Sequence, residues 1–279
     1  MMNRIIRMLA AVALGLGLIA TPVFASGAAR KNAEDHAFSF EGPFGQFNRA
    51  QLQRGWEVFR QVCASCHSLN YLRFRNLAEP GGPEFTVEQA KAFASQYDIT
   101  DGPNDEGEMF TRPGRLSDAF PAPYPNEQAA KAANNNALPP DLSLLVKARE
   151  GWDYPWYVSP IIKLFKGNGG AEYVRSLISG FEEPPAHEEQ KEGLSYNPYF
   201  PGHWIAMPPP LSGEDVEYKD GTPNTLKQEA TDVAAFLAWV SMPKMEERKK
   251  IGLMAMLYLL VFALLMYMVK LALWSKVEH

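Results

Sequence analysis

The residues of this chain best suited to chemistry are Cys63, Cys66 and His67, in the sequence Cys-Ala-Ser-Cys-His. A C-x-x-C-H motif is typical of the covalent attachment of a c-type haem. Thiols three positions apart on a helix lie on the same face, so both can reach the two vinyl groups of one porphyrin. The histidine that follows can bind the iron through its imidazole. We therefore predict one covalent haem c, attached to Cys63 and Cys66, with His67 as an axial ligand.

The motif has two other interpretations, a redox-active dithiol and half of a zinc site. A structural zinc site takes four ligands at short spacing, and the chain has only two cysteines, both in the motif. A thioredoxin-like dithiol belongs to a βαβ unit, which the sequence does not predict. No cysteine remains for a disulfide, so the packed core and the haem must stabilise the domain.

A low-spin electron carrier needs a second axial ligand, commonly methionine or histidine. The candidates in the middle of the chain are Met109, Met207, Met242, Met245, His36, His187 and His203. Three prolines follow Met207 directly, and they stiffen the segment so that a thioether is presented at little conformational cost. Spacing thus favours Met207, with His203 next, while core packing of Met207 stays an alternative.

The helix that must deliver the thiols is predicted to begin at Asn48, a favourable N-cap residue. It carries an apolar stripe that we expect to face the core, and it runs straight into Cys63. The stripe consists of Leu52, Trp56, Phe59 and Val62.

Further helices are predicted from N-cap residues, capping boxes and apolar stripes. They run from Thr86 toward Tyr97, from Asn126 to about Asn135, from Pro139 through Arg149, over 172–179, and from Thr225 with Val233, Phe236, Leu237 and Val240 as its stripe. Pro243 suits the first turn of a final helix. Proline is frequent, at 22 residues, and no segment has a convincing strand pattern. The sequence predicts a mainly α domain with long loops.

Residues 1–25 have the features of a cleaved signal peptide: two arginines, a short apolar run over 9–19, and the small-residue end Val23-Phe24-Ala25. Residues 251–269 form an uncharged run about 28 Å long as a helix, close to the thickness of a bilayer core. We therefore expect an extracytoplasmic domain over 26–243, a juxtamembrane turn over 244–250, a transmembrane helix over 251–269 and a cytoplasmic tail over 270–279. The basic cluster at 248–250 then lies outside, against the positive-inside rule, because the signal peptide takes precedence.

The charge of the chain is asymmetric. The whole sequence carries 27 basic and 32 acidic residues, and the segment 26–243 has a net charge of about −10. This balance argues against nucleic acid as a partner and favours a basic protein.

Beyond the motif, the chain resembles the cytochrome c1 family, the membrane-anchored haem subunits of cytochrome bc1 complexes. The matching stretches are CASCHSLNY at 63–71, DGPNDEGEMF at 101–110, RPGRLSD at 112–118, PYPN at 123–126, AANN at 132–135, ALPPDLS at 137–143 and YNPYFPG at 196–202. They span nearly all of the predicted mature chain. A lone C-x-x-C-H is shared by c-type cytochromes generally, whereas this ordered set is specific.

The resemblance implies a class I cytochrome c-like haem domain with long loop insertions and one C-terminal transmembrane helix. It implies that Met207 is the second axial ligand. It also implies a haem pocket: Asn134, Pro139 and Pro140 line the haem edge, Arg149 pairs with a propionate, and Tyr173 lies near the haem.

For function, the resemblance implies a relay in ubiquinol–cytochrome c oxidoreductase rather than a self-sufficient enzyme. The haem would take an electron from the Rieske iron–sulfur protein and pass it to a basic, soluble or anchored cytochrome c. Cytochrome b would be a partner, the complex would be dimeric, and the haem domain would lie in the periplasm on the bacterial inner membrane. The stretch 151–169 looks inserted relative to mitochondrial members and lacks the disulfide of some bacterial ones, so we expect packing by Trp152, Trp156 and Phe165 instead.

Two other functions share some of these features. A membrane-anchored c-type cytochrome acting alone or in a terminal oxidase has the haem and the tail helix, but needs none of the matching loops. A haem enzyme such as a peroxidase needs an open or labile iron site, which a fixed Met207 would close.

Overall fold

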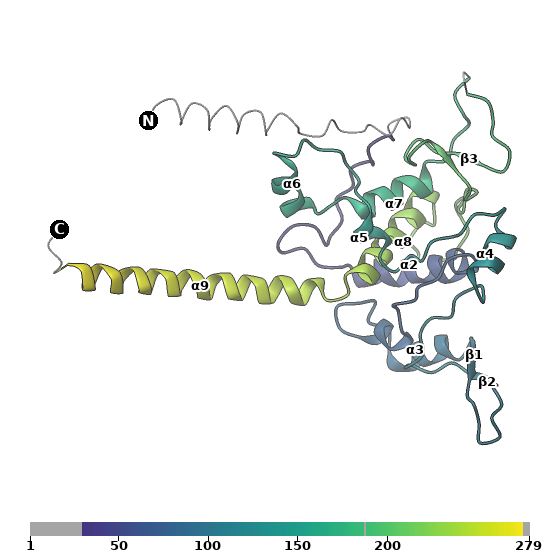
Figure 1. Cartoon of the computed structure of the whole chain (residues 1–279), viewed down its shortest axis with the longest axis horizontal. Coiled ribbons are helices and arrows are strands. Elements are labelled where there is room, and N and C mark those ends of the chain that lie inside the picture. The colour runs from purple at the N-terminus through teal and green to yellow at the C-terminus, as the bar shows by residue number, and fades with distance from the viewer. Residues whose placement is uncertain (1–29, 187, 276–279) are drawn as a thin grey trace, which may run out of the picture.

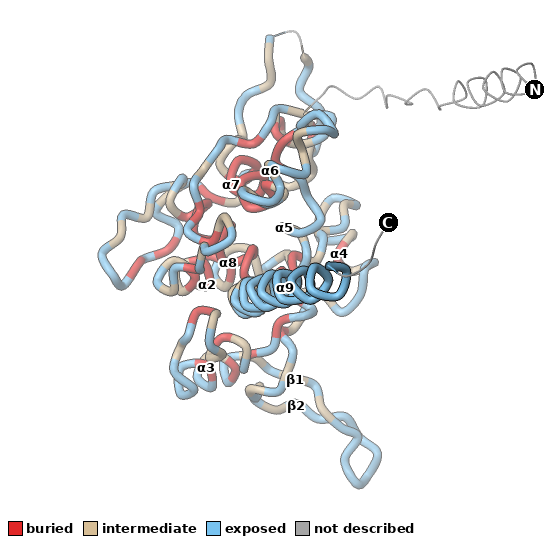
Figure 2. The backbone as a smooth tube through the Cα atoms, turned by 90° about the vertical axis from the view of Figure 1, so that its left-hand side faces the viewer, coloured by how far each residue is buried: buried red, intermediate tan, exposed pale blue. Residues whose placement is uncertain are grey.

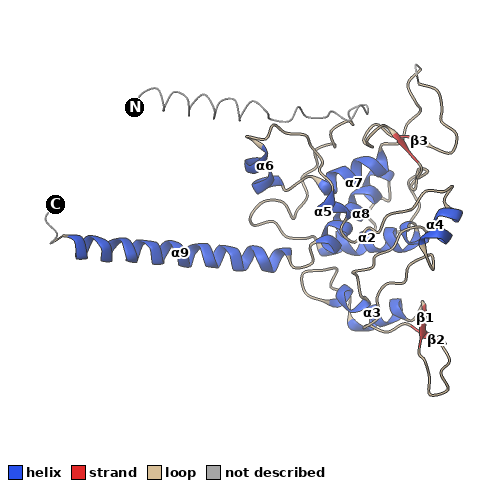
Figure 3. Ribbon diagram, in the orientation of Figure 1, coloured by secondary structure: helices blue, strands red, loops and turns tan. Residues whose placement is uncertain are grey.

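The computed structural model describes residues 30–186 and 188–275, so the predicted signal peptide and the last four residues lie outside the described residues. The described chain forms a mainly helical head from which one long helix, α9 (Met245–Trp274), projects (Figure 1 and Figure 3). The predicted fold class, a mainly α head with one C-terminal apolar helix, is confirmed.

The helices of the head are α2 (Arg49–Gln61), α3 (Val87–Ala94), α4 (Glu127–Ala133), α5 (Leu145–Ala148), α6 (Ser159–Lys166), α7 (Gly170–Ser179) and α8 (Leu226–Ser241), with the 3₁₀ helices η1 (Cys63–Ser65) and η2 (Phe74–Ala78). Two antiparallel pairs join β1 (Asp98–Asp101) to β2 (Phe110–Pro113) and β3 (Ser195–Tyr196) to β4 (Trp204–Ile205). The expectation of no strands was therefore wrong, since pairing partners rather than side-chain pattern hold these short segments.

Helix α2 packs along α8, and the two form the centre of the head (Figure 1). Asn48 caps α2 as predicted, because its side chain accepts a hydrogen bond of 3.2 Å from the backbone N–H of Gln51. Gly55 permits the close approach of the helices: a Cβ there would lie 2.1 Å from the carbonyl oxygen of Asp232. The sequence pattern predicted both helices, and the glycine sets how closely they pack.

An aromatic cluster fills the space between α2 and α8. Trp56 and Phe59 of α2 meet Phe236 of α8 with ring centroids 5.8 and 5.9 Å apart, and Phe120 packs on the α2 rings at 5.6 and 5.5 Å. All four side chains are buried. Burial of each such ring contributes about 1.5–3 kcal/mol, which fixes the axis of the helix that leads to the C-x-x-C-H motif.

Several expected helix boundaries differ in the structure. Helix α2 ends at Gln61, two residues before Cys63, and the helix from Thr86 ends at Ala94. The segment expected to be helical from Pro139 is irregular as far as Leu144, because the Asp141 carboxylate bonds to groups outside any helix. Pro243 lies just before the N-cap Lys244 rather than in the first turn of α9.

Helix α9 has the length and apolar composition to cross a membrane, and it contains the predicted span 251–269. No residue in the 18-residue apolar window of α9 is buried by the head. Among the described residues, α9 is the one helix that meets this criterion, which fits a single C-terminal membrane anchor.

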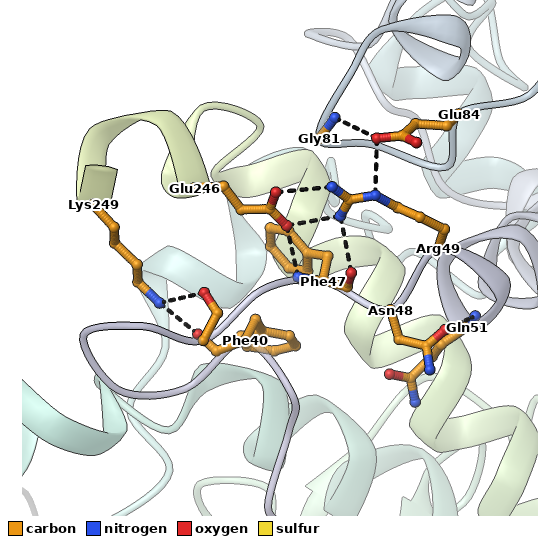
Figure 4. A network of polar contacts seen from close by, with 10 residues as sticks. Phe40, Phe47, Asn48, Arg49, Gln51, Gly81, Glu84, Glu246 and Lys249 are labelled. Atoms are coloured by element: carbon orange, nitrogen blue, oxygen red, sulfur yellow. Dashed lines mark hydrogen bonds and ion pairs between the residues drawn. The ribbon is translucent and has the colours of Figure 1, made fainter. Parts of the chain in front are cut away.

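The start of α9 is joined to the head by a charged network (Figure 4). The Arg49 guanidinium donates two hydrogen bonds, 2.7 and 2.8 Å, to the Glu246 carboxylate, which also accepts one from the backbone N–H of Phe47. The Lys249 ammonium donates to the carbonyl oxygens of Phe40 and Gly45 at 2.7 and 3.2 Å. Lys249, one residue of the basic cluster 248–250, therefore binds the head. This contact gives a structural reason for a cation at the start of α9.

Helix α7 covers α8 on the side opposite to α3 and buries Glu172 almost completely (Figure 2). Burial, together with the neighbouring Glu41 carboxylate, raises the pKa of Glu172 above its usual range. The protonated form can donate to Glu41, so α7 is tied to the N-terminal arm by a carboxyl pair.

Glu172→Gln is expected to stabilise the chain at alkaline pH. A carboxyl whose pKa is raised on folding disfavours the folded state increasingly as pH rises above its unfolded value of about 4.5. The amide keeps a donor for Glu41 without this penalty. Thermal unfolding of the full chain in detergent should therefore give equal stabilities near pH 4 and a more stable variant at pH 9. If the variant differed from the wild type in stability by the same amount at pH 4 and pH 9, the raised pKa of Glu172 would be contradicted.

Of the three aromatic residues expected to pack in the 151–169 stretch, one does so. Trp152 is buried, and its indole N–H donates to the Ala33 carbonyl at 3.1 Å. Trp156 and Phe165 are exposed, at 85% and 55%. Their predicted role in core packing was wrong, because α6 has no buried residue and turns its apolar face outward.

Candidate haem-attachment site

The C-x-x-C-H motif forms a tight turn just beyond the end of α2. The backbone N–H groups of Cys66 and His67 both donate to the carbonyl oxygen of Cys63, at 3.1 and 2.9 Å. Both cysteines are free, and each residue as a whole has intermediate exposure. With thirteen residues in α2, the motif lies about 20 Å from the junction with α9. Figure 1 shows this end of α2 close to α4, on the side of the head away from α9.

The imidazole of His67 is oriented by the backbone of Pro140, whose carbonyl oxygen lies 2.8 Å from Nδ1. When Nδ1 carries the proton and donates it to this carbonyl, Nε2 has a free lone pair. Burial lowers the pKa of His67, so the neutral form that binds metals is favoured. A ligating histidine almost always has such a partner for its other nitrogen, so this ring is prepared to bind iron.

The position of the Pro140 carbonyl depends on Asp141. Its carboxylate accepts hydrogen bonds of 2.8 Å from the Ser68 hydroxyl and from the backbone N–H of Asn70, and one of 2.9 Å from the N–H of Ser143. The chain after His67 and the loop before α5 are thereby fixed to each other. Sequence reasoning missed Asp141 as a site residue, although it lies in the matching stretch 137–143.

Asn134 is connected to the second thiol through a tyrosine. Its side-chain amide donates to the Tyr124 hydroxyl at 3.0 Å and to the Ala130 carbonyl at 2.7 Å. The same hydroxyl lies 4.0 Å from Sγ of Cys66. Tyr124 was also missed, and the only signal for it was its place in the stretch 123–126.

Arg149 and Tyr173 lie together at a second edge of the head. Burial raises the pKa of Tyr173, and the nearby Arg149 and Arg30 act in the opposite direction. The Arg30 guanidinium lies over the Tyr173 ring, 5.6 Å from its centroid. The Arg149 side chain is exposed, so it is free to meet an anionic group such as a propionate.

Met207 follows β4 by two residues and is half-buried. The hairpin before it is anchored to the head, because the Asn197 side chain donates to the Leu177 carbonyl of α7 at 2.7 Å. The competing ligand His203 lies within this hairpin, with its ring 5.6 Å from that of Tyr196. The pairing of Met207 with His67 across one iron stays a prediction.

The chemistry of the motif fits a covalent haem better than its alternatives. Burial raises the pKa of the Cys63 thiol, whereas a redox-active dithiol needs a lowered pKa. No group of three potential metal-ligating side chains of His, Cys, Asp or Glu occurs in the described ranges, so the residues for a zinc site are not assembled there. Two unpaired thiols in one turn, with an adjacent imidazole whose Nε2 is free, are the donors that haem c requires.

A C-x-x-C-H turn on a mainly helical head, carried by one apolar C-terminal helix, defines a membrane-anchored c-type cytochrome. The model of the Cytochrome C1 family matches residues 38–277. The chain belongs to this family.

Relatives from bacteria and plants extend over most of the chain. It is 52% identical over 240 residues to "Cytochrome b/c1" of Bradyrhizobium diazoefficiens, covering 85% of this chain and 35% of that protein. It is 39% identical over 275 residues to "Cytochrome c1" of Blastochloris viridis, covering 98% and 97%, and 45% identical over 258 residues to "Cytochrome c1 1, heme protein, mitochondrial" of Arabidopsis thaliana, covering 90% and 77%. The chain thus spans about a third of the Bradyrhizobium protein and most of the other two.

Proposed function

We propose that this chain is the electron-transfer subunit of a ubiquinol–cytochrome c oxidoreductase, the cytochrome bc1 complex, and carries one covalent haem c. The observation that carries the proposal is the His67 imidazole, held by the Pro140 carbonyl beside two free thiols, in a chain of this family. The electron acceptor proposed is a basic cytochrome c.

Each residue of the site has a defined part in the proposal. The Cys63 and Cys66 thiols would hold the haem through two thioether bonds, each formed by addition of one S–H across one vinyl group. Nε2 of His67 and the sulfur of Met207 would hold the iron, which would leave no position open to a substrate. When bound, haem c supplies a one-electron ferric–ferrous couple, and a thioether ligand favours the ferrous state.

The remaining predicted residues shape the pocket. The Arg149 guanidinium pairs with a propionate, and a bidentate pair of this kind also fixes the orientation of the group it binds. Tyr173 packs beside it, while Asn134, Pro139 and Pro140 line the exposed edge. Asn134 is held in place by Tyr124, and Pro140 by Asp141, as the hydrogen bonds above describe.

We assign the steps on either side of this relay to other proteins. The electron arrives from the Rieske iron–sulfur protein, after quinol is oxidised on cytochrome b. The name of the Bradyrhizobium relative, which joins cytochrome b to c1, supports a cytochrome b partner. The chain is therefore one subunit of an enzyme and not an enzyme alone, and the complex is proposed to be dimeric.

The proposed location is the bacterial inner membrane, with a single pass through α9. Residues 1–25 are removed on export, the haem domain over 26–243 lies in the periplasm, and 270–279 remain in the cytoplasm. The motif lies at the end of α2 away from the α9 junction, so the proposed haem edge is open to a soluble acceptor.

Electron transfer to a basic cytochrome c should slow as ionic strength rises. The head has a net charge of about −10, and its β1–β2 hairpin carries Asp105, Glu106 and Glu108 on an exposed loop. Asp105→Lys combined with Glu106→Lys should reduce the rate at low salt and flatten its salt dependence.

The matched control for this prediction is Glu247→Lys, which reverses an exposed charge at the anchor end of the head. It should leave the rate unchanged. A wild-type rate that does not change with salt would contradict docking at the acidic loop of the β1–β2 hairpin. So would a Glu247→Lys effect as large as that of the double variant.

Co-purification tests the proposed complex. The full chain, extracted from native membranes in mild detergent, should bring down a cytochrome b and a Rieske protein. Recovery of the haem protein without them would favour the alternative, an anchored cytochrome acting alone or in a terminal oxidase. Binding of carbon monoxide to the reduced haem would favour a haem enzyme, because it needs an open axial position.

A further inference from the structure

One face of the head is apolar and uncovered, and the electron relay makes no use of it. It is formed by α6 and the loop before it, with one residue from the N-terminal arm: Phe44, Trp156, Tyr157, Ile161, Leu164 and Phe165. Their exposures run from 55% for Phe165 to 85% for Trp156. Six large apolar side chains exposed on one face of a folded domain mark a contact with something other than water.

Ion pairs turn this face outward. Ile161, Leu164 and Phe165 lie at i, i+3 and i+4 and so share one side of α6. On the opposite side, the Lys163 ammonium pairs with Glu150 at 2.6 Å and Lys166 pairs with Asp35 at 2.6 Å. Because the lysines tie the polar side to the head, the apolar side must point away from it.

The outward face adjoins the start of the membrane anchor. The carbonyl oxygen of Phe165 lies 3.6 Å from where a Cβ on Gly42 would stand. The same arm bonds to α9 through the Lys249 ammonium at Phe40 and Gly45. Figure 1 shows α6 on the side of the head from which α9 leaves, and Figure 2, which views that side, shows α6 in the foreground.

The chemistry of the surface matches the boundary between lipid headgroups and acyl chains. Tryptophan and tyrosine are enriched at this depth, and an amphipathic helix lies there with its apolar side in the acyl region. The exposed cations Arg248 and Lys250, in the last turn before the apolar run of α9, would meet anionic phosphates. A groove between residue 44 and α9, lined partly by Lys250 and Leu253, continues the surface to the anchor.

We propose that α6 and Phe44 form a second membrane contact, with which the head rests on the bilayer interface beside α9. A single transmembrane helix can tilt in the bilayer, and the head fixed to it would tilt with it. Two contacts on one side define how the head is inclined, and so hold the distal haem site at a constant height above the membrane.

Fluorescence quenching in the assembled complex tests this proposal. Leu164→Cys and Phe44→Cys are labelled with bimane in the full-length chain, with Val87→Cys, an exposed position on α3, as the matched control. The chain without an added cysteine serves as the labelling blank. The complexes are reconstituted into phosphatidylcholine–phosphatidylglycerol vesicles, with and without lipid brominated near the carbonyl end of its acyl chains.

We expect brominated lipid to remove about half of the fluorescence at positions 44 and 164 and little at 87, with iodide quenching in the reverse order. Iodide quenching at 164 equal to that at 87, without quenching by brominated lipid, would place the face in water and overturn the proposal. Protection of 164 from both quenchers would overturn it too, because a protein subunit would then cover α6. Quenching by brominated lipid and by iodide does not depend on whether the haem relays electrons.

Discussion

Replacement of Met207 by leucine is expected to lower the midpoint potential of the haem by a few hundred millivolts and to block electron flow. Leucine has a similar volume but no sulfur, so the proposed thioether ligand of the iron would be lost. The haem should stay attached, because the two thioether bonds and His67 do not involve this residue. Redox titration of the visible spectrum measures the shift, and carbon monoxide should now bind the reduced haem.

Two matched variants make the test specific. Met109→Leu changes an exposed methionine in the acidic loop and should leave the midpoint unchanged. His203→Ala removes the competing ligand candidate and should also have little effect. An unchanged midpoint in Met207→Leu, or a large shift in His203→Ala, would contradict the ligand assignment.

The second large effect is expected on stability, from Arg54→Met. The Arg54 guanidinium donates to both carboxylate oxygens of Asp232 at 2.8 and 3.3 Å, and to Asp220 at 2.6 Å. Asp232 is completely buried on α8. Without Arg54 the Gln228 amide still donates to it, but no cation remains, and a buried charge left without its partner costs about 3–5 kcal/mol. Chemical denaturation of the full chain in detergent measures this loss.

The double variant Arg54→Met with Asp232→Leu separates the cost of a stranded charge from the loss of packing. When both partners are replaced by apolar groups, the uncompensated charge is gone, so most of the stability should return. A double variant as unstable as Arg54→Met would show that packing of the arginine stem, and not the buried carboxylate, carries the effect.

Helix starts with local signals could be predicted from the sequence. Thr86 and Gln89 form the reciprocal capping box expected of them, at 2.9 and 3.2 Å, and Thr225 caps α8 by accepting from the N–H of Gln228. The bonds concerned join residues three apart, so a short stretch of sequence contains all the information. The C-x-x-C-H turn is local in the same sense.

Features that depend on distant residues could not be predicted in this way. The Pro-Pro-Asp sequence at 139–141 resembles a helix start, yet Asp141 bonds to Ser68 and Asn70, about seventy positions earlier. The strands of the β1–β2 hairpin have four residues each and few apolar side chains, which is too short for a strand pattern to stand out in the sequence. Helix α6 was not predicted, since its N-cap residue, Val158, is not one of the polar residues that mark a helix start and makes no side-chain hydrogen bond.

The residues of the candidate site also fall into two groups, those marked by a local sequence signal and those brought in by distant contacts. Cys63, Cys66 and His67 follow from spacing, whereas Tyr124 and Asp141 enter through contacts made only in the folded chain. Asn134, Pro140, Arg149 and Tyr173 came from resemblance, and the structure places the first two at the motif and the other two beside each other.

The most direct test of the proposed relay is quinol-driven reduction of the haem in the complex purified through this chain. The proposal predicts that adding a ubiquinol analogue reduces the covalent haem, seen at its α-band. It also predicts that removing the Rieske protein abolishes this reduction, while chemical reductants still act. A covalent haem that stays oxidised in the intact complex with quinol, or is reduced equally well without the Rieske protein, would contradict it.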